Sequence, residues 1–117
     1  MFYAGGKKYL EGTYVNSAYD GLWNFYYQNG YLKQTGVYKM GKAEGEWKFY
    51  HPNNQILKTG RYVNDREEGE WKYYYDTGEL QGVIQYSKGE RVGTGYEYDR
   101  SGKVIDKKDY FPISPPK

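Results

Sequence analysis

Cysteine is absent from these 117 residues, so the chain can build neither a disulfide framework nor a thiolate metal site. No apolar run approaches the ~20 residues that a membrane-spanning helix needs. The start of the sequence also lacks the apolar stretch of a signal peptide. From these absences we expect a cytoplasmic protein.

Neither sign of charge is in large excess, and aliphatic residues are scarce. The 17 basic and 15 acidic residues leave a net charge of +2, which is too small to indicate nucleic-acid binding. The 24 aromatic residues (17 Tyr, 4 Phe and 3 Trp) outnumber the 17 Val, Ile, Leu and Met residues. A tyrosine ring can be covered while its hydroxyl stays hydrated. The composition therefore favours a thin sheet over a helical bundle.

What the chain has in abundance is a repeat of 24 residues. Five columns share this spacing and one register: Gly21, Gly45, Gly69 and Gly93; Trp23, Trp47 and Trp71; Tyr26, Tyr50, Tyr74 and Tyr98; Leu32, Ile56, Leu80 and Val104; Tyr38, Tyr62, Tyr86 and Tyr110. A fixed period of about 20–50 residues is typical of stacked repeat proteins, in which each unit buries its apolar face against its neighbours.

Each unit contains two stretches with the period of two that is typical of strands, such as residues 21–27 and 32–38. Asn29-Gly30 lies between them, and Gly and Asn tolerate positive φ, so we expect a tight primed turn there. Equivalent turns are expected at 53–54, 77–78 and 101–102, and return turns at Gly41, Asp65 and Gly89. The chain is therefore predicted to be all-β: an elongated, open, solenoid-like single layer, an antiparallel meander of β-hairpin repeats.

A two-residue turn at Asn29-Gly30 also predicts which residues face each other across the strands. The expected pairs are Trp23 with Gly36, Tyr27 with Leu32, Gly21 with Tyr38, Trp47 with Gly60, Gly45 with Tyr62 and Glu46 with Arg61. The Trp23 and Trp47 rings would then each lie across from a glycine. Because the second unit has neighbours on both sides, we expect Trp47→Ala to destabilise the fold more than Trp23→Ala.

These repeats divide the chain into one domain, residues 1–117. Its predicted parts are a partial repeat (1–20), three full repeats (21–44, 45–68 and 69–92), a degenerate capping repeat (93–111) and a proline-rich tail (112–117). The fourth unit departs from the pattern because Gly95 stands where the tryptophan would be. Terminal repeats are expected to be atypical, since nothing stacks on them.

One predicted face of the sheet is a stripe of tryptophan and other rings, and the opposite face carries a tyrosine column. Tyrosine beside basic residues is typical of a recognition surface, because it supplies area and hydrogen bonding at low entropic cost. The candidate binding residues are Tyr26, Tyr50, Tyr74, Tyr98, Lys48 and Lys72. The alternative is that curling of the sheet buries this column and exposes the other.

The spelling Gly45-Glu46-Trp47-Lys48-Phe49-Tyr50, followed by an Asn or Gly turn, a Leu-like residue, Gly, Tyr and a Gly-Lys turn, resembles the variant MORN repeat of bacteria. The long form in YwqK-family antitoxins is the most similar, and the resemblance covers about residues 12 to 110. It implies binding roles that differ among proteins: protein–protein contacts, neutralisation of a toxin, and contact with phosphoinositide-rich membranes.

Catalytic and cofactor chemistry have little support in the sequence. The single histidine, His51, stands where Tyr27 and Tyr75 stand in other repeats, with no nucleophile or orienting group recurring near it. The carboxylates before the repeat glycines, such as Asp20 and Glu44, are interpreted as a solvated face. Glycines spaced one per turn form no phosphate-binding loop. We therefore expect no enzyme activity, no cofactor and no metal.

Three classes of binding function remain. The first is a protein-binding module, including an antitoxin or immunity protein that neutralises a partner toxin. The second is a carbohydrate or cell-wall binder, since tandem Trp-Tyr hairpins also occur in choline-binding repeats, although those are shorter. The third is an acidic-lipid binder, which the interleaved Glu46 and Glu70 disfavour because they break up the basic residues. A protein partner is the reading we favour.

Overall fold

The computed structural model describes residues 10–15 and 18–110, and all regular structure in them is strand. The nine strands are β1 (Leu10–Val15), β2 (Ala18–Tyr26), β3 (Leu32–Lys39), β4 (Lys42–Tyr50), β5 (Ile56–Val63), β6 (Arg66–Tyr74), β7 (Leu80–Ser87), β8 (Glu90–Tyr98) and β9 (Val104–Tyr110). The proline-rich tail lies outside the described residues.

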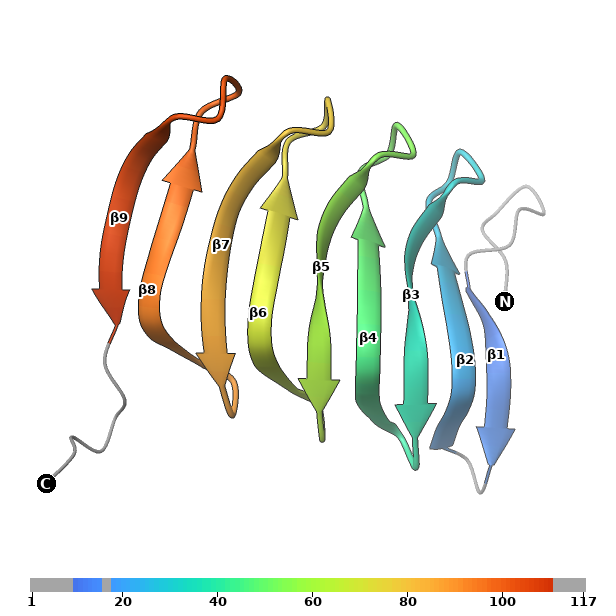
Figure 1. Ribbon diagram of the computed structural model, residues 1–117. Coiled ribbons are helices and arrows are strands. Elements are labelled where there is room, and N and C mark those ends of the chain that lie inside the picture. Colours follow the sequence, from blue (N-terminus) through green and yellow to red (C-terminus); the bar gives the residue numbers. More distant parts are fainter. Residues whose placement is uncertain (1–9, 16–17, 111–117) are drawn as a thin grey trace, which may run out of the picture.

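The strands form one open antiparallel sheet in which each strand lies beside the next one in the sequence (Figure 1). Within the described residues no second layer covers either face, and the principal extents are 50 × 38 × 17 Å. The all-β single-layer meander predicted from the repeat is confirmed. Because the described part of the chain holds no helix, none there is long or apolar enough to cross a membrane.

The hairpin loops that follow β2, β4, β6 and β8 differ from the predicted primed turns. In the first, Gly30 N–H donates to Tyr27 O at 2.9 Å, and Tyr27 N–H donates to Tyr31 O at 2.8 Å. Only the last loop residue has positive φ, and it is Gly30, Asn54, Gly78 or Gly102. A primed turn needs positive φ at its first central residue too, so these are three-residue loops ending in a left-handed residue.

The primed turns lie instead at the return connections. Met40 and Gly41 have φ of 52° and 83°, and they join the paired residues Lys39 and Lys42. Asn64-Asp65 and Lys88-Gly89 repeat this geometry. Two positive φ values match the twist of the flanking strands, which allows the shortest connection. The prediction placed the right turn type at the wrong end of the hairpin.

The predicted register is nevertheless confirmed along the body of the strands. Trp23 pairs with Gly36, and Gly21 pairs with Tyr38. Equivalent pairs in the next repeat join Trp47 with Gly60, Gly45 with Tyr62 and Glu46 with Arg61. The pair between Tyr27 and Leu32 was wrong, because Leu32 pairs with Tyr26. A bulge beside the loop absorbs the extra loop residue and restores the register.

A second set of bulges explains the glycine column that precedes each tryptophan. Between β3 and β4 the register shifts so that Gly45, Glu46 and Trp47 lie opposite Gly36. The bulged glycines Gly21, Gly45, Gly69 and Gly93 have φ between 66° and 76°. Only glycine adopts this backbone conformation at little cost. The bulge therefore explains why glycine recurs at this position in every repeat.

These bulges place each tryptophan over the preceding strand. A Cβ added to Gly36 would lie 2.0 Å from the Trp47 ring, and Gly12 and Gly60 stand in the same relation to Trp23 and Trp71. The predicted ring-over-glycine packing exists, but with the glycine of the preceding strand. All three indoles are at most 2% exposed. The difference expected between Trp47 and Trp23 therefore has no basis in their burial.

The fourth unit forms a hairpin like the other units, but it lacks their tryptophan. Its strands β8 and β9 pair with the register of the earlier repeats, from Gly93↔Tyr110 to Tyr98↔Val104. Gly95 occupies the tryptophan position, and residues 104–109 of the last strand are exposed. The polar character predicted for a terminal unit thus coexists with regular strand pairing.

Candidate functional site

The sheet has two faces of different character. The tryptophan face consists of the ring stripe Trp23, Phe25, Tyr38, Trp47, Phe49, Tyr62, Trp71, Tyr73 and Tyr86. The tyrosine face lies opposite and carries Leu22, Tyr26, Val37, Lys48, Tyr50, Arg61, Lys72, Tyr74, Val83, Tyr96 and Tyr98. Side chains alternate between the faces along each strand, which separates the two sets.

Rings of the tryptophan face cover one another. Tyr38 meets Trp47 edge-on with centroids 5.1 Å apart, and Tyr62 meets Trp71 in the same way at 5.1 Å. Desolvation, with the nearby Glu67 carboxylate adding to it, raises the pKa of Tyr62 to about 12. Much of the hydrophobic area of this face is therefore used inside the protein.

On the tyrosine face, Tyr26 differs from the other members of its column. Its hydroxyl donates a 2.5 Å hydrogen bond to Glu11 Oε1 of β1. This bond, with burial and the carboxylate charge, raises the pKa of Tyr26 to about 12. The first repeat thus uses its tyrosine internally.

Tyr50, Tyr74 and Tyr98 are half-buried, and their hydroxyls have no hydrogen-bond partner among the described residues. Lys48 and Lys72 lie on the same face and are exposed. Lys72 Nζ is 3.7 Å from Glu70 Oε1, an ion pair with both side chains about half exposed that contributes little to stability. These five predicted site residues therefore share one face and keep polar atoms available to a partner.

Two exposed apolar pairs on this face were missed from the sequence. Leu22 and Val37 are cross-strand partners that are 61% and 43% exposed. Val83 pairs with Tyr96, which is 37% exposed. The signal was present as apolar residues at strand positions that alternate with the buried rings. Tyr96 also stacks on Tyr98, with ring centroids 6.3 Å apart. Exposed apolar and aromatic side chains of this kind are typical of a binding surface.

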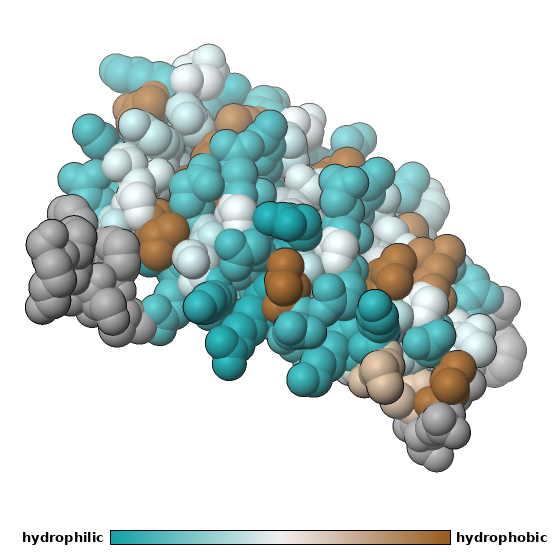
Figure 2. All heavy atoms as spheres, turned by 60° about the horizontal axis from the view of Figure 1, so that its bottom comes forward, coloured by the Kyte–Doolittle hydropathy of each residue, from teal (hydrophilic) through white to brown (hydrophobic). Residues whose placement is uncertain are grey.

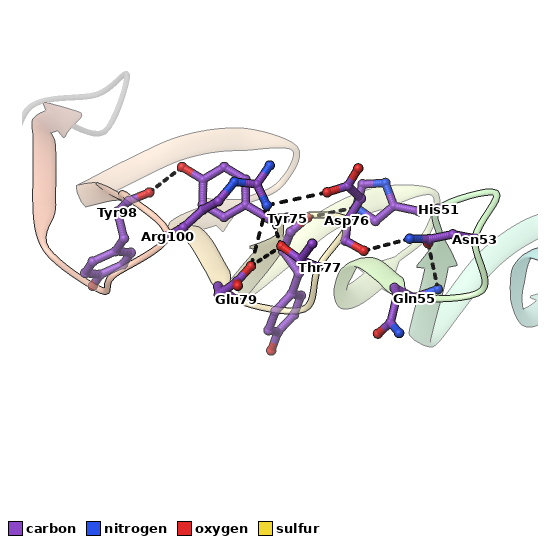
Figure 3. Close-up of polar contacts among 10 residues, drawn as sticks. His51, Asn53, Gln55, Tyr75, Asp76, Thr77, Glu79, Tyr98 and Arg100 are labelled. Carbon is purple, nitrogen blue, oxygen red and sulfur yellow. Dashed lines mark hydrogen bonds and ion pairs between the residues drawn. The ribbon is translucent and has the colours of Figure 1, made fainter.

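The loop edge of the sheet, formed by loops 28–30, 52–54, 76–78 and 100–102, is held by a side-chain ladder. Tyr27 Oη donates to Tyr50 O at 2.5 Å, and Tyr75 Oη donates to Tyr98 O at 2.6 Å. His51, labelled in Figure 3, fills the equivalent place. Its Nε2 lies 2.9 Å from Tyr74 O. Because a carbonyl can only accept, Nε2 must carry the proton. His51 therefore has a structural role beside the loop.

Arg100 joins the last two loops in a different way. Its guanidinium lies 4.3 Å from the Tyr75 ring centroid and 3.5 Å from Asp76 Oδ1 (Figure 3). It also reaches Glu79 and the Thr77 hydroxyl. In the earlier loops an asparagine donates to the next loop, as Asn53 Nδ2 does to Asp76 O at 2.7 Å. Charge thus replaces an amide where the sequence loses the asparagine.

Carboxylates at the opposite edge bind turn backbone. Asp20, Glu44 and Glu68 accept hydrogen bonds from Met40, Asn64 and Lys88 N–H at 3.5, 2.6 and 3.0 Å. Each therefore caps the primed turn of the following hairpin, which is more specific than the solvated face expected from the sequence. Among the described residues, no three His, Asp or Glu side chains gather as a metal site would require.

Comparison with known families identifies the repeat. The MORN repeat variant matches residues 19–40, 43–64 and 67–88, more than half of the chain. The chain belongs to the MORN repeat variant family. Repeats of this family generally serve as binding modules for proteins or lipids and are not known as enzymes. No match was found among curated proteins.

The three matched segments begin two residues before the predicted repeats and end before the fourth unit. The resemblance expected over residues 12 to 110 is therefore found over a shorter range. The unmatched β8–β9 hairpin is the one that lacks the tryptophan.

Proposed function

We propose that this MORN repeat protein acts by stoichiometric binding of a partner protein across the tyrosine face. The proposal rests on a difference between the two faces in how their aromatic side chains are used. Rings of the tryptophan face pack against one another, whereas the hydroxyls of Tyr50 and Tyr74 form no hydrogen bond with any described residue. Aromatic residues with free polar tips are the common anchors of protein interfaces.

The pattern of charge favours a protein partner over an acidic membrane. Glu46 pairs across the strands with Arg61, and Lys72 lies near Glu70. Acidic and basic side chains thus alternate over the middle of the face, which gives no uniform positive field for anionic lipids. Hydrophilic residues also cover most of the surface in Figure 2, with apolar residues in separate patches. A mixed surface of this kind suits a complementary protein surface.

Within this proposal, a cytoplasmic antitoxin or immunity role is the specific form we favour. It rests on the resemblance to YwqK-family antitoxins of bacteria and on the composition of a pure binding surface. A carbohydrate or an acidic lipid as the ligand is the alternative. The face would inhibit its partner by covering it, which requires a tight one-to-one complex.

The test begins with partners recovered from the native host and continues with purified components. Isothermal titration should give a one-to-one complex that Tyr50→Ala with Tyr74→Ala weakens by at least about 1–2 kcal/mol per anchor. Tyr31→Ala serves as the matched control, because Tyr31 is an exposed loop tyrosine at 49% exposure. Circular dichroism must show that each variant remains folded.

Two outcomes would refute the proposal. Unchanged affinity in the folded double variant would exclude the tyrosine face as the interface. Binding to purified glycans or to phosphatidylserine vesicles, with no protein partner that titrates, would exclude the protein-partner class. A partner protein that is not a toxin would retain the binding function and remove only the antitoxin role.

A further inference from the structure

On the tryptophan face, the ammonium group of Lys58 lies among aromatic rings of the neighbouring strands. Lys58 of β5 pairs with Phe49 on one side and with Tyr73 on the other. Its Nζ lies 4.7 Å from the Phe49 centroid, 5.7 Å from Trp71 and 5.9 Å from Tyr73. The protein thus holds its own ammonium group over three ring faces, a favourable cation–π arrangement.

One repeat further on, the same position has no side chain. Gly82 of β7 pairs with Tyr73 and with Glu97, in the register that Lys58 has with its neighbours. A hollow of about 300 Å³ opens there, lined by Tyr73, Gln81, Gly82, Ile84, Arg91, Tyr96 and Glu97. A Cβ added at Gly82 would lie 2.9 Å from the backbone oxygen of Tyr96, so no side chain can leave Gly82 as the Lys58 side chain leaves its strand. The hollow beside Gly82 is open to solvent.

Beside this hollow, a carboxylate stands where the earlier repeats have an aromatic ring. Glu97 occupies the column of Phe25, Phe49 and Tyr73, and it pairs with Asp106 of β9 on the same face. Glu97 and Asp106 make no ion pair with any described residue. Like charges directly opposite each other disfavour the sheet. A cation placed between Tyr73 and Glu97 would relieve this repulsion.

Arg91 and Lys108 are the basic residues near the hollow. The Arg91 guanidinium lies over the Tyr110 ring, 5.7 Å from its centroid, and donates to the Tyr110 hydroxyl at 3.4 Å. Lys108 pairs with Gly95 on β8. Arg91 also hydrogen-bonds the Tyr86 hydroxyl, so its guanidinium is held by two tyrosines at one border of the hollow. The place for an added cation is therefore the opposite border, between the Tyr73 ring and Glu97.

We propose that the hollow at Gly82 binds a primary alkylammonium group, with its alkyl chain along Gly82 and Ile84 and its ammonium between the Tyr73 ring and the Glu97 carboxylate. The group has the chemistry of the Lys58 side chain and can come from a free amine or from a lysine presented by a polypeptide. This site lies on the tryptophan face and is independent of the partner proposed for the tyrosine face.

The first test is a titration with n-butylammonium, followed by the amide signals of the protein in heteronuclear NMR spectra. We expect saturable shifts centred on Tyr73, Gly82 and Glu97, which Glu97→Gln weakens by roughly two- to five-fold, as for an exposed ion pair. Glu46→Gln is the matched control, because it removes the same charge from an exposed position on the other face. Non-saturating shifts, or equal affinity in both variants, would overturn the proposal.

A second variant tests the reasoning from Lys58. Lys58→Ala should open a second hollow among Phe49, Trp71 and Tyr73, so that butylammonium binds at two places and raises the thermal midpoint of this variant more than that of the wild type. No second site in the folded variant would refute the inference drawn from Lys58. A lysine-containing peptide and its acetyl-lysine form then distinguish the sources: selective binding of the unmodified peptide assigns a polypeptide ligand, and binding of only the free amine assigns a small molecule.

Discussion

The indole of Trp47 lies directly on Gly36 of the preceding strand, so closely that a Cβ at Gly36 would be 2.0 Å from the ring. The same ring is paired in register with Gly60 of the following strand, yet it does not lie over that residue. The bulge at Gly45 produces this direction, because it sets three residues of β4 against one of β3.

Gly36→Ala should therefore destabilise the protein strongly. A methyl group there must displace a buried ring, and overpacking of this kind typically costs about 1–3 kcal/mol or more. Urea unfolding of the variant measures the change. Val37→Ala, at an exposed neighbouring position on the other face, should change the free energy of unfolding by less than about 0.5 kcal/mol. Equal effects of the two changes would contradict the packing.

The three tryptophans should be of similar energetic importance. Each is at most 2% exposed and lies on a glycine of the strand before it. Trp23→Ala, Trp47→Ala and Trp71→Ala should each cost on the order of 3–5 kcal/mol. Chemical denaturation of the three variants compares them, and a much smaller loss for Trp23 would show that the edge of the stripe is loosely packed.

Met40→Asn should stabilise the protein. Met40 is 81% exposed and has φ of 52°, in the left-handed region that asparagine adopts more readily than methionine. The change creates Asn-Gly, the preferred pair for a primed turn, and should add about 0.5–1 kcal/mol. Thermal unfolding measures the gain, and Met40→Leu, which keeps the strain, should show none.

His51 should be replaceable by tyrosine and not by phenylalanine. The Tyr27 and Tyr75 hydroxyls make the carbonyl hydrogen bond that His51 Nε2 makes in its repeat. His51→Tyr should leave stability unchanged, whereas His51→Phe should cost about 1 kcal/mol because Tyr74 O loses its donor. Denaturation midpoints of the two variants decide the matter, and equal midpoints would show that the ring alone is sufficient.

Alkaline pH should destabilise the fold through Tyr62. Burial raises its pKa to about 12 in the folded state, above the value of about 10 in the unfolded chain. A raised folded pKa stabilises fully below about pH 10, and this stabilisation is lost as the pH rises toward about 12. Unfolding followed as a function of pH should show less alkaline loss in Tyr62→Phe than in the control Tyr31→Phe. Identical profiles would exclude Tyr62 as a cause.

Strand positions and pairing could be predicted from the sequence because one period of 24 residues governs rings, glycines and turns together. The turn types could not be predicted, because Met40 and Lys88 adopt positive φ, which methionine and lysine rarely do. The direction in which Trp23 and Trp47 point could not be predicted either, because each has a glycine on both neighbouring strands. At the candidate site, the hydrogen bond between Tyr26 and Glu11 could not be predicted, because Glu11 belongs to none of the repeated columns.

Every strand of this sheet is hydrogen-bonded only to the strands adjacent to it in sequence. Contacts between side chains reach no further than one repeat unit, as in the ladder of the loop edge. Over the described residues the sheet therefore has no contact between distant repeats that would set its length. Duplicating residues 45–68 in tandem would present each new side chain with the neighbours it already has, and both ends of the sheet would remain as they are. In this architecture length is a modular quantity, which gene duplication can extend one hairpin pair at a time without a change in any other residue.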